Sequence, residues 1–151
     1  MGSPKLKNLL LLLLLLFCSQ IAFSTFSSPS VDNILISEVL YDAPTTGGDT
    51  TEECFELFNP TDSAVDLTDW TIDDNYDTLI LSGSIPAKGY FVVAKNTAAF
   101  NALYGYDPDL TLLWGDFALS NSGDFLTLYD DLGSEVDFVA WENAVSGWSV
   151  S

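Results

Sequence analysis

The sequence predicts an all-β fold, a β-sandwich with one short helix, preceded by a cleavable signal peptide. Short apolar segments recur from Ile34 onward, and turn residues separate them at the spacing typical of sandwiches. A single segment has the capping residues and the length of a helix. Of the 151 residues, 127 remain after the first 24, which is enough for one domain with a hydrophobic core.

The start of the chain has the pattern of a secretory signal peptide. Two lysines make a basic start, residues 9–17 form an apolar core, and Ala22 and Ser24 are the small residues that a signal peptidase reads. A membrane anchor is the alternative, but these nine apolar residues are fewer than the about 20 that a spanning helix needs. We therefore predict a signal peptide over residues 1–24 and a flexible lead-in over residues 25–33.

The first elements follow from apolar runs and turn chemistry. Apolar residues predict a strand over Ile34–Tyr41 and a second strand over Cys54–Asn59, with a polar loop over Ala43–Glu53 between them. Asn59 and Pro60 then have the chemistry of a type I turn, which favours Asn first and Pro second. Further short strands are predicted within 64–67, 69–74 and 78–95, with a turn at Pro86 and Gly89 before the strand Tyr90–Ala94.

The second half of the domain contains the helix and a hairpin. We predict the helix over Asn96–Leu103, with its first residue or the next as N-cap and Gly105 at its end. A strand is predicted over Leu110–Trp114. The clearest element is a hairpin over Asp124–Trp141, in which two alternating strands flank the turn sequence "DDLG".

The charge of the chain excludes several functions. After cleavage, the two lysines Lys88 and Lys95 stand against 22 acidic residues, a formal charge of −20, and the chain has no arginine or histidine. Nucleic acid and anionic membranes should repel it, because phosphate binding requires Lys and Arg. Imidazole bases and histidine-ligated zinc are also excluded. Cys54 is the one cysteine after cleavage, so no internal disulfide can form.

The order of several motifs indicates a family. The segments "ILISEVLY", "FELFNPTDSAVDLTDWTIDD", "IPAKGYFVVA" and "LSNSGDFLTLYDDLGSEVDFVAW" follow one another as in a lamin-tail domain. Over Ile34–Trp148 the chain resembles the secreted bacterial and archaeal versions of that domain. The resemblance implies an immunoglobulin-like β-sandwich over residues 34–151. It also implies a non-catalytic module, of a kind often attached to secreted hydrolases or to surface proteins.

The resemblance is incomplete at the end of the chain. The family pattern usually continues with another strand past the Gly-Trp at Trp148, and this sequence stops at Ser151. We expect that the domain lacks its last strand or that the sandwich closes differently here.

Glu38 and Glu56 are the sharpest candidates for a site. Each lies in an apolar strand and has the parity of neighbours expected to face inward, such as Ile36 and Cys54. If the two strands pair, the carboxylates could face each other, as glycoside hydrolysis requires. The alternative, which we favour, is that both accept backbone hydrogen bonds at a sandwich corner.

Aspartate-rich turns suggest calcium, which takes about six to eight oxygen ligands. Asp73, Asp74 and Asp77 form the densest cluster. Neither this cluster nor the acidic pairs further along has the spacing of an EF-hand. Solvated turn residues are therefore favoured over a calcium site, and no other cofactor is expected.

Four tryptophans could provide a sugar-stacking platform. Trp70 and Trp114 lie within apolar runs and are predicted to pack in the core. Trp141 and Trp148 flank a polar loop and are the better candidates for exposure, although packing is favoured for both. Cys54 and the serines of "LSNSGD" have no histidine base, so nucleophilic catalysis is not expected.

These observations predict a secreted, acidic module that binds or tethers and does not catalyse. Its partner would be an extracellular protein, a polysaccharide or a component of the cell envelope, with no nucleic-acid binding and no membrane span after signal cleavage. The alternative is the ancillary N-terminal domain of a larger secreted hydrolase or nuclease, whose catalytic part lies beyond residue 151. The candidate binding residues are Glu38, Glu56, Trp141 and Trp148.

Overall fold

The computed structural model of the protein describes residues 33–43, 51–74, 76–112 and 117–142. The predicted signal peptide, and all but the last residue of the predicted lead-in, lie outside these ranges and stay predictions. No helix within the described ranges has the length and apolar character that crossing a membrane requires.

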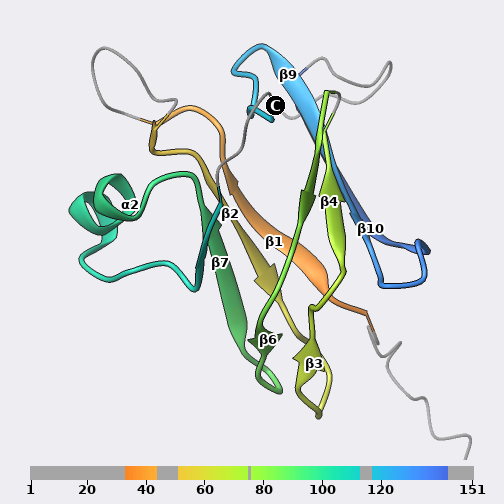
Figure 1. Ribbon diagram of the computed structural model, residues 1–151. Coiled ribbons are helices and arrows are strands. Elements are labelled where there is room, and N and C mark those ends of the chain that lie inside the picture. The colour runs from red at the N-terminus through yellow and green to blue at the C-terminus, as the bar shows by residue number, and fades with distance from the viewer. Residues whose placement is uncertain (1–32, 44–50, 75, 113–116, 143–151) are drawn as a thin grey trace, which may run out of the picture. The chain divides into compact units, whose positions relative to one another are not determined.

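The described residues form two four-stranded sheets and a two-stranded ribbon (Figure 1). The first sheet is antiparallel except between its last two strands, and in spatial order it contains β1 (Leu35–Leu40), β2 (Cys54–Phe58), β7 (Tyr90–Ala94) and β8 (Leu110–Thr111). The second sheet is antiparallel throughout and contains β10 (Glu135–Glu142), β9 (Gly123–Tyr129), β4 (Thr71–Asp73) and β5 (Thr78–Ile80). The ribbon pairs β3 (Val65–Asp66) with β6 (Ser84–Ile85).

Alternating apolar residues of the two sheets meet in one core. Phe55 and Leu57 of β2 are almost fully buried, and so are Leu126 and Leu128 of β9. All four belong to a buried cluster that also takes residues from β4, β5, β7 and β10. Burying each such side chain contributes about 1.5–3 kcal/mol. The predicted all-β sandwich is therefore confirmed, and α2 (Thr97–Tyr104) is the one helix of the described residues.

The helix α2 has the capping residues that the sequence predicts, although it spans Thr97–Tyr104 and not the predicted Asn96–Leu103. Asn96 is the N-cap, and its Oδ1 accepts a hydrogen bond from the backbone N–H of Ala99 at 2.9 Å. Gly105 has a left-handed φ of 81° and donates its N–H to the carbonyl of Asn101 at 2.8 Å. This backbone conformation suits glycine, which has no Cβ, and it ends the helix.

The first sheet has a second apolar face, on the side of α2. Cys54, Val92 and Ala94 form a small buried cluster with Phe100 of α2, and Leu40 packs against it. We call this surface the helix-side face. In Figure 1, α2 lies to the left of β2 and β7, and the second sheet lies to their right. The first sheet is thus covered on both faces, by the core on one and by the helix on part of the other.

The predicted hairpin is present as β9 and β10. Asp130 closes its turn, because its Oδ1 accepts hydrogen bonds from the N–H groups of Leu132 at 2.9 Å and Ser134 at 2.7 Å. The predicted strand over Leu110–Trp114 is observed as β8 for its first two residues. Its last two residues fall within 113–116, outside the described ranges.

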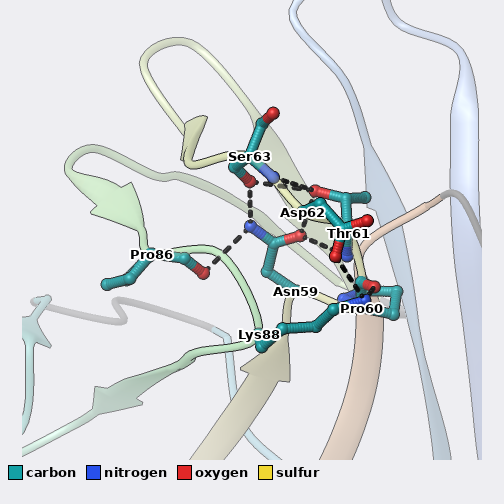
Figure 2. Close-up of polar contacts among 7 residues, drawn as sticks. All are labelled: Asn59, Pro60, Thr61, Asp62, Ser63, Pro86 and Lys88. Atoms are coloured by element: carbon teal, nitrogen blue, oxygen red, sulfur yellow. Dashed lines mark hydrogen bonds and ion pairs between the residues drawn. The ribbon is translucent and has the colours of Figure 1, made fainter.

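The segment after β2 forms a corner around the buried Asn59 (Figure 2). The Asn59 Nδ2 donates to the backbone carbonyls of Ser63 (2.8 Å), Ile85 (3.2 Å) and Pro86 (3.0 Å). Its Oδ1 accepts from the backbone N–H and the hydroxyl of Thr61, at 3.0 and 2.7 Å. The chain bends where the turn was predicted, and the Asn59 side chain closes this bend through Thr61. Asn59 also ties the bend to a loop that follows about 25 residues later in the chain.

Leu67 and Trp70 connect this corner to the core. Leu67 is fully buried, whereas Trp70 is half-buried and packs against the edge of the same cluster. The backbone carbonyl of Trp70 accepts a hydrogen bond from the N–H of Leu81 at 2.7 Å. The predicted packing of Trp70 on the core is confirmed, but Leu67 fills the interior. Trp114, also predicted to be core, lies outside the described residues.

Candidate functional site

A β-bulge in β1 decides where the candidate carboxylates lie. Ile36 pairs with Leu57 of β2 and Glu38 pairs with the preceding residue, Glu56, so Ser37 is an extra residue in β1. An extra residue reverses the alternation of side chains along a strand. Consequently Ile36 packs against the core, whereas Glu38 lines a cavity on the helix-side face.

The prediction that Glu38 and Glu56 point into the core of the sandwich is therefore wrong. The β2 residues that enter the core are Phe55 and Leu57. Glu56 lies between them and faces the opposite way, in register with Val92 of β7 on the helix-side face. The expectation that the two carboxylates face each other if their strands pair is confirmed. The strands β1 and β2 are paired, and their register places Glu38 directly opposite Glu56.

A hydroxyl, rather than the backbone, contacts one of these carboxylates. The Ser37 Oγ donates to the Glu56 Oε1 at 2.7 Å. The favoured interpretation from sequence, that both carboxylates accept backbone hydrogen bonds, is thus not what holds Glu56. Instead, the hydroxyl of the bulge residue Ser37 orients the Glu56 carboxylate. The bulge therefore has two effects: it turns Glu38 to the helix-side face, and it positions Glu56, which pairs with Glu38.

The two carboxylates line a small cavity between the sheet and α2. The sheet contributes Cys54, Phe55 and Val92, and the segment that includes α2 contributes Phe100, Tyr104 and Tyr106. The cavity volume is about 30 Å³, which is room for about one water-sized group. A sugar ring does not fit into this space between the carboxylates. The arrangement therefore gives no support to glycoside hydrolysis by Glu38 and Glu56.

Cys54, at the base of the cavity, is not an activated nucleophile. Burial, assisted by the nearby carboxylates of Glu38 and Glu56, raises the pKa of its thiol from 9.0 to about 11. A hydrogen bond with Tyr104 acts in the opposite direction but is outweighed. The thiol is protonated at neutral pH, whereas thiol chemistry requires the thiolate.

Tyr104 lines the same cavity and forms a hydrogen bond with Cys54. Burial raises the pKa of its phenol, and so do the neighbouring Cys54, once its thiol ionises at alkaline pH, and the carboxylate of Glu38. It is therefore an uncharged ring at neutral pH. Sequence reasoning missed both Tyr104 and Tyr106 as site residues. The available signal was the sequence "YGY" at the end of the helix, where the glycine ends α2 and places one tyrosine on either side of the turn.

Trp141 is a core residue, so the prediction that it is a candidate for exposure and binding is wrong. It is 4 % exposed and belongs to the core cluster. Its ring stacks on Tyr41 at a centroid distance of 5.2 Å, and its Nε1–H donates to the Ser120 carbonyl at 2.8 Å. This agrees with the packing that we favoured from sequence. Trp148, the other candidate, lies outside the described residues.

The carboxylates of Asp73, Asp74 and Asp77 do not converge on a common point. Asp74 is buried, and its Oδ1 accepts hydrogen bonds from the N–H groups of Tyr76 at 2.6 Å and Asp77 at 2.7 Å. Its Oδ2 accepts one from the N–H of Ala118 at 3.0 Å. Among the described residues, no group of three or more acidic, Cys or His side chains could hold a metal ion. The geometry gives the calcium hypothesis no support.

The whole of the described structure falls within one family match. The family model of the lamin tail domain matches residues 27–143, which include both sheets, α2 and the cavity. No curated protein matches the chain. Lamin tail domains are immunoglobulin-like and non-enzymatic, in agreement with the two packed sheets. The chain therefore belongs to the lamin tail domain family.

Proposed function

We propose that the protein is a secreted, non-catalytic binding module that contacts its ligand through the helix-side face. The observation that carries this proposal is the composition of the cavity there. Two glutamates from paired strands and two tyrosines line the same cavity, and burial keeps the Cys54 thiol beside them protonated. Such a set of groups holds a ligand by charge and by aromatic contact.

The chemistry of the chain supports a binding role over a catalytic one. It has no histidine and no arginine, which removes the commonest general base and the bidentate clamp for phosphate. The cavity holds about one water-sized group, so the candidate acid and base have no room for a polymer substrate between them. Membership of a family of non-enzymatic domains points in the same direction.

The signal-peptide pattern of residues 1–24 supports a place outside the cell. The ligand would then be an extracellular protein, a polysaccharide or a component of the cell envelope. The strong negative charge disfavours nucleic acid as a ligand. The same binding role would serve a free-standing protein or an ancillary domain of a larger secreted hydrolase.

Three measurements test this proposal. The protein recovered from culture medium should begin at Thr25, as mass spectrometry can show. It should have no turnover with nuclease, phosphatase, esterase or glycosidase substrates. It should also be retained by at least one immobilised extracellular fraction, and Glu38→Gln/Glu56→Gln should reduce that retention. Turnover that disappears in Glu56→Gln would contradict the proposal.

A further inference from the structure

Glu38 and Glu56 form an uncompensated pair of like charges on the helix-side face. They lie directly opposite each other across the antiparallel β1–β2 pair, an arrangement that destabilises a sheet. The described lysines, Lys88 and Lys95, form their ion pairs with other carboxylates, at 3.0 and 3.2 Å. A cation from another molecule would relieve the repulsion.

Aromatic residues of α2 and of the segment after it complete the lining of the cavity. Tyr104 is 41 % exposed and Tyr106 is 53 % exposed, a large apolar area for two neighbouring side chains. Phe100 supports both, with ring centroids at 4.5 Å from Tyr104 and 5.3 Å from Tyr106. The faces of such rings attract cations. Carboxylates and aromatic rings around one cavity therefore favour the same kind of ligand, an organic cation.

The size of the cavity selects among cations. A volume of about 30 Å³ accepts one group of about the size of a water molecule. The lysine ammonium is such a group, a compact charge on a slender apolar stem, whereas the arginine guanidinium is a broad plane. Calcium takes about six to eight oxygens, and the cavity side chains offer two carboxylates and two phenol groups.

We propose that this cavity receives the ammonium group of a lysine side chain on a basic extracellular protein. Glu38 and Glu56 are its ion-pair partners, and Tyr104 and Tyr106 flank its apolar stem. The inference rests on the proposed binding function and gives that function a ligand class. The formal charge of −18 on the whole chain complements a basic partner and attracts it from a distance.

Calorimetric titration with a defined peptide tests the inference. The probe is an end-capped trilysine peptide, added to the secreted protein at constant ionic strength. The same peptide with Nε-acetylated lysines should bind at least about tenfold more weakly, because it has lost the charge that the carboxylates contact. A triarginine peptide of equal charge should also bind more weakly than trilysine, because of its size.

Matched variants separate the cavity from general attraction. Glu38→Gln/Glu56→Gln should weaken trilysine binding about tenfold, and Tyr106→Leu about threefold. Asp131→Asn/Glu135→Gln removes two charges from exposed residues of the β9–β10 hairpin, which belongs to the second sheet and does not line the cavity. This control should weaken binding less than about twofold. Equal losses in the two double variants would mean general electrostatic attraction only and would overturn the inference.

A stability measurement accompanies each titration. The melting temperature of Glu38→Gln/Glu56→Gln should match or exceed that of the parent, because the variant removes a repulsion. Weaker binding by a more stable protein cannot be a consequence of unfolding.

Tighter binding of a glucosamine oligomer than of trilysine would overturn the assignment to a protein ligand. If the protein bound no lysine peptide but were still retained by an immobilised extracellular fraction, only the lysine inference would be overturned. Hydrolytic turnover would overturn the proposed function.

Discussion

At the scale of single residues, the neutral side chain of Asn59 makes many of the hydrogen bonds that hold the corner after β2. Its carboxamide makes five hydrogen bonds, three as donor and two as acceptor, and the residue is fully buried. Only an amide combines two N–H donors with a carbonyl acceptor in this shape. The sequence indicates Asn59 as a turn residue, but the backbone carbonyls of the second loop that it contacts are visible only in three dimensions.

Asn59→Asp should therefore lower the free energy of unfolding by about 3 kcal/mol or more. The carboxylate cannot donate to the three carbonyls that Asn59 contacts, and it adds a buried charge beside them. Urea unfolding followed by tryptophan fluorescence measures the change. Thr61→Val, which removes one hydroxyl donor from the same corner, is the control and should cost about 1 kcal/mol. An unchanged midpoint for Asn59→Asp would show that the corner does not depend on these bonds.

The raised pKa of Cys54 predicts a loss of stability at alkaline pH. The thiol titrates near 9.0 when unfolded and near 11 in the fold, so between these values the unfolded chain binds fewer protons than the folded one. The contribution of this thiol to the free energy of unfolding is therefore fully present below the unfolded pKa. It decreases as the pH rises from the unfolded pKa to the folded pKa. Cys54→Ala should lack this component, so its unfolding free energy should fall less steeply. Urea unfolding in reducing buffer across the window checks this, and parallel pH profiles for the two proteins would contradict it.

At the scale of elements, β1 and β10 link the edges of the two sheets. The backbone N–H of Ile36 in β1 donates to the Asp137 Oδ2 of β10 at 2.7 Å. Near the other end of both strands, Tyr41 stacks on Trp141 and donates its hydroxyl to Glu142 Oε1 at 3.0 Å. That hydrogen bond, with some burial, raises the pKa of the Tyr41 phenol. Side chains therefore join two strands that do not pair in one sheet.

Trp141→Ala should accordingly destabilise the protein by about 3–5 kcal/mol, as expected for a buried aromatic ring. The matched change Trp70→Ala should cost less, because Trp70 is half-buried at the edge of the core. Thermal unfolding of both variants under the same conditions gives the comparison. A smaller loss for Trp141→Ala than for Trp70→Ala would mean that the edge of the sandwich at Tyr41 tolerates a cavity.

Elements whose conformation depends on neighbours in sequence were predictable. The cap at Asn96, the left-handed Gly105 and the hairpin turn at Asp130 all depend on hydrogen bonds within about four residues. The bulge at Ser37 has no such local signal, because it depends on the register of β1 against β2. For this reason the strand was predicted and the direction of Glu38 was not.

At the scale of the whole molecule, the charge of the chain opposes folding through self-repulsion. The whole chain has four lysines against 22 acidic residues, a formal net charge of −18. Some aspartates lower this cost by binding backbone N–H groups. The Thr68 hydroxyl, followed by its N–H, holds the pKa of Asp66 below its ordinary value. The ionised form of such a group stabilises the fold above the unfolded pKa, and this contribution is lost as the pH falls through the folded pKa.

Salt should therefore stabilise the protein by screening, and calcium should act only through ionic strength. The melting temperature should rise gradually with sodium chloride. At constant ionic strength, millimolar calcium should give no further shift, because Asp74 already binds three backbone N–H groups. Melting curves with and without calcium decide between the two mechanisms. A calcium-dependent increase that Asp74→Asn abolishes would show a specific site at Asp73, Asp74 and Asp77.

The sequence by itself determined the all-β class, most strands, the helix with its caps and the acidic character, because these depend on composition and on contacts between residues close in the chain. Tertiary structure alone decided which face each carboxylate occupies and that Trp141 is covered. It also decided that Tyr104 at the end of α2 and Tyr106 line the same cavity as Glu38 and Glu56. These outcomes depend on strand register and on packing between segments distant in sequence. A shift of one residue in register changes which face a side chain occupies while leaving the local pattern of the strand unchanged.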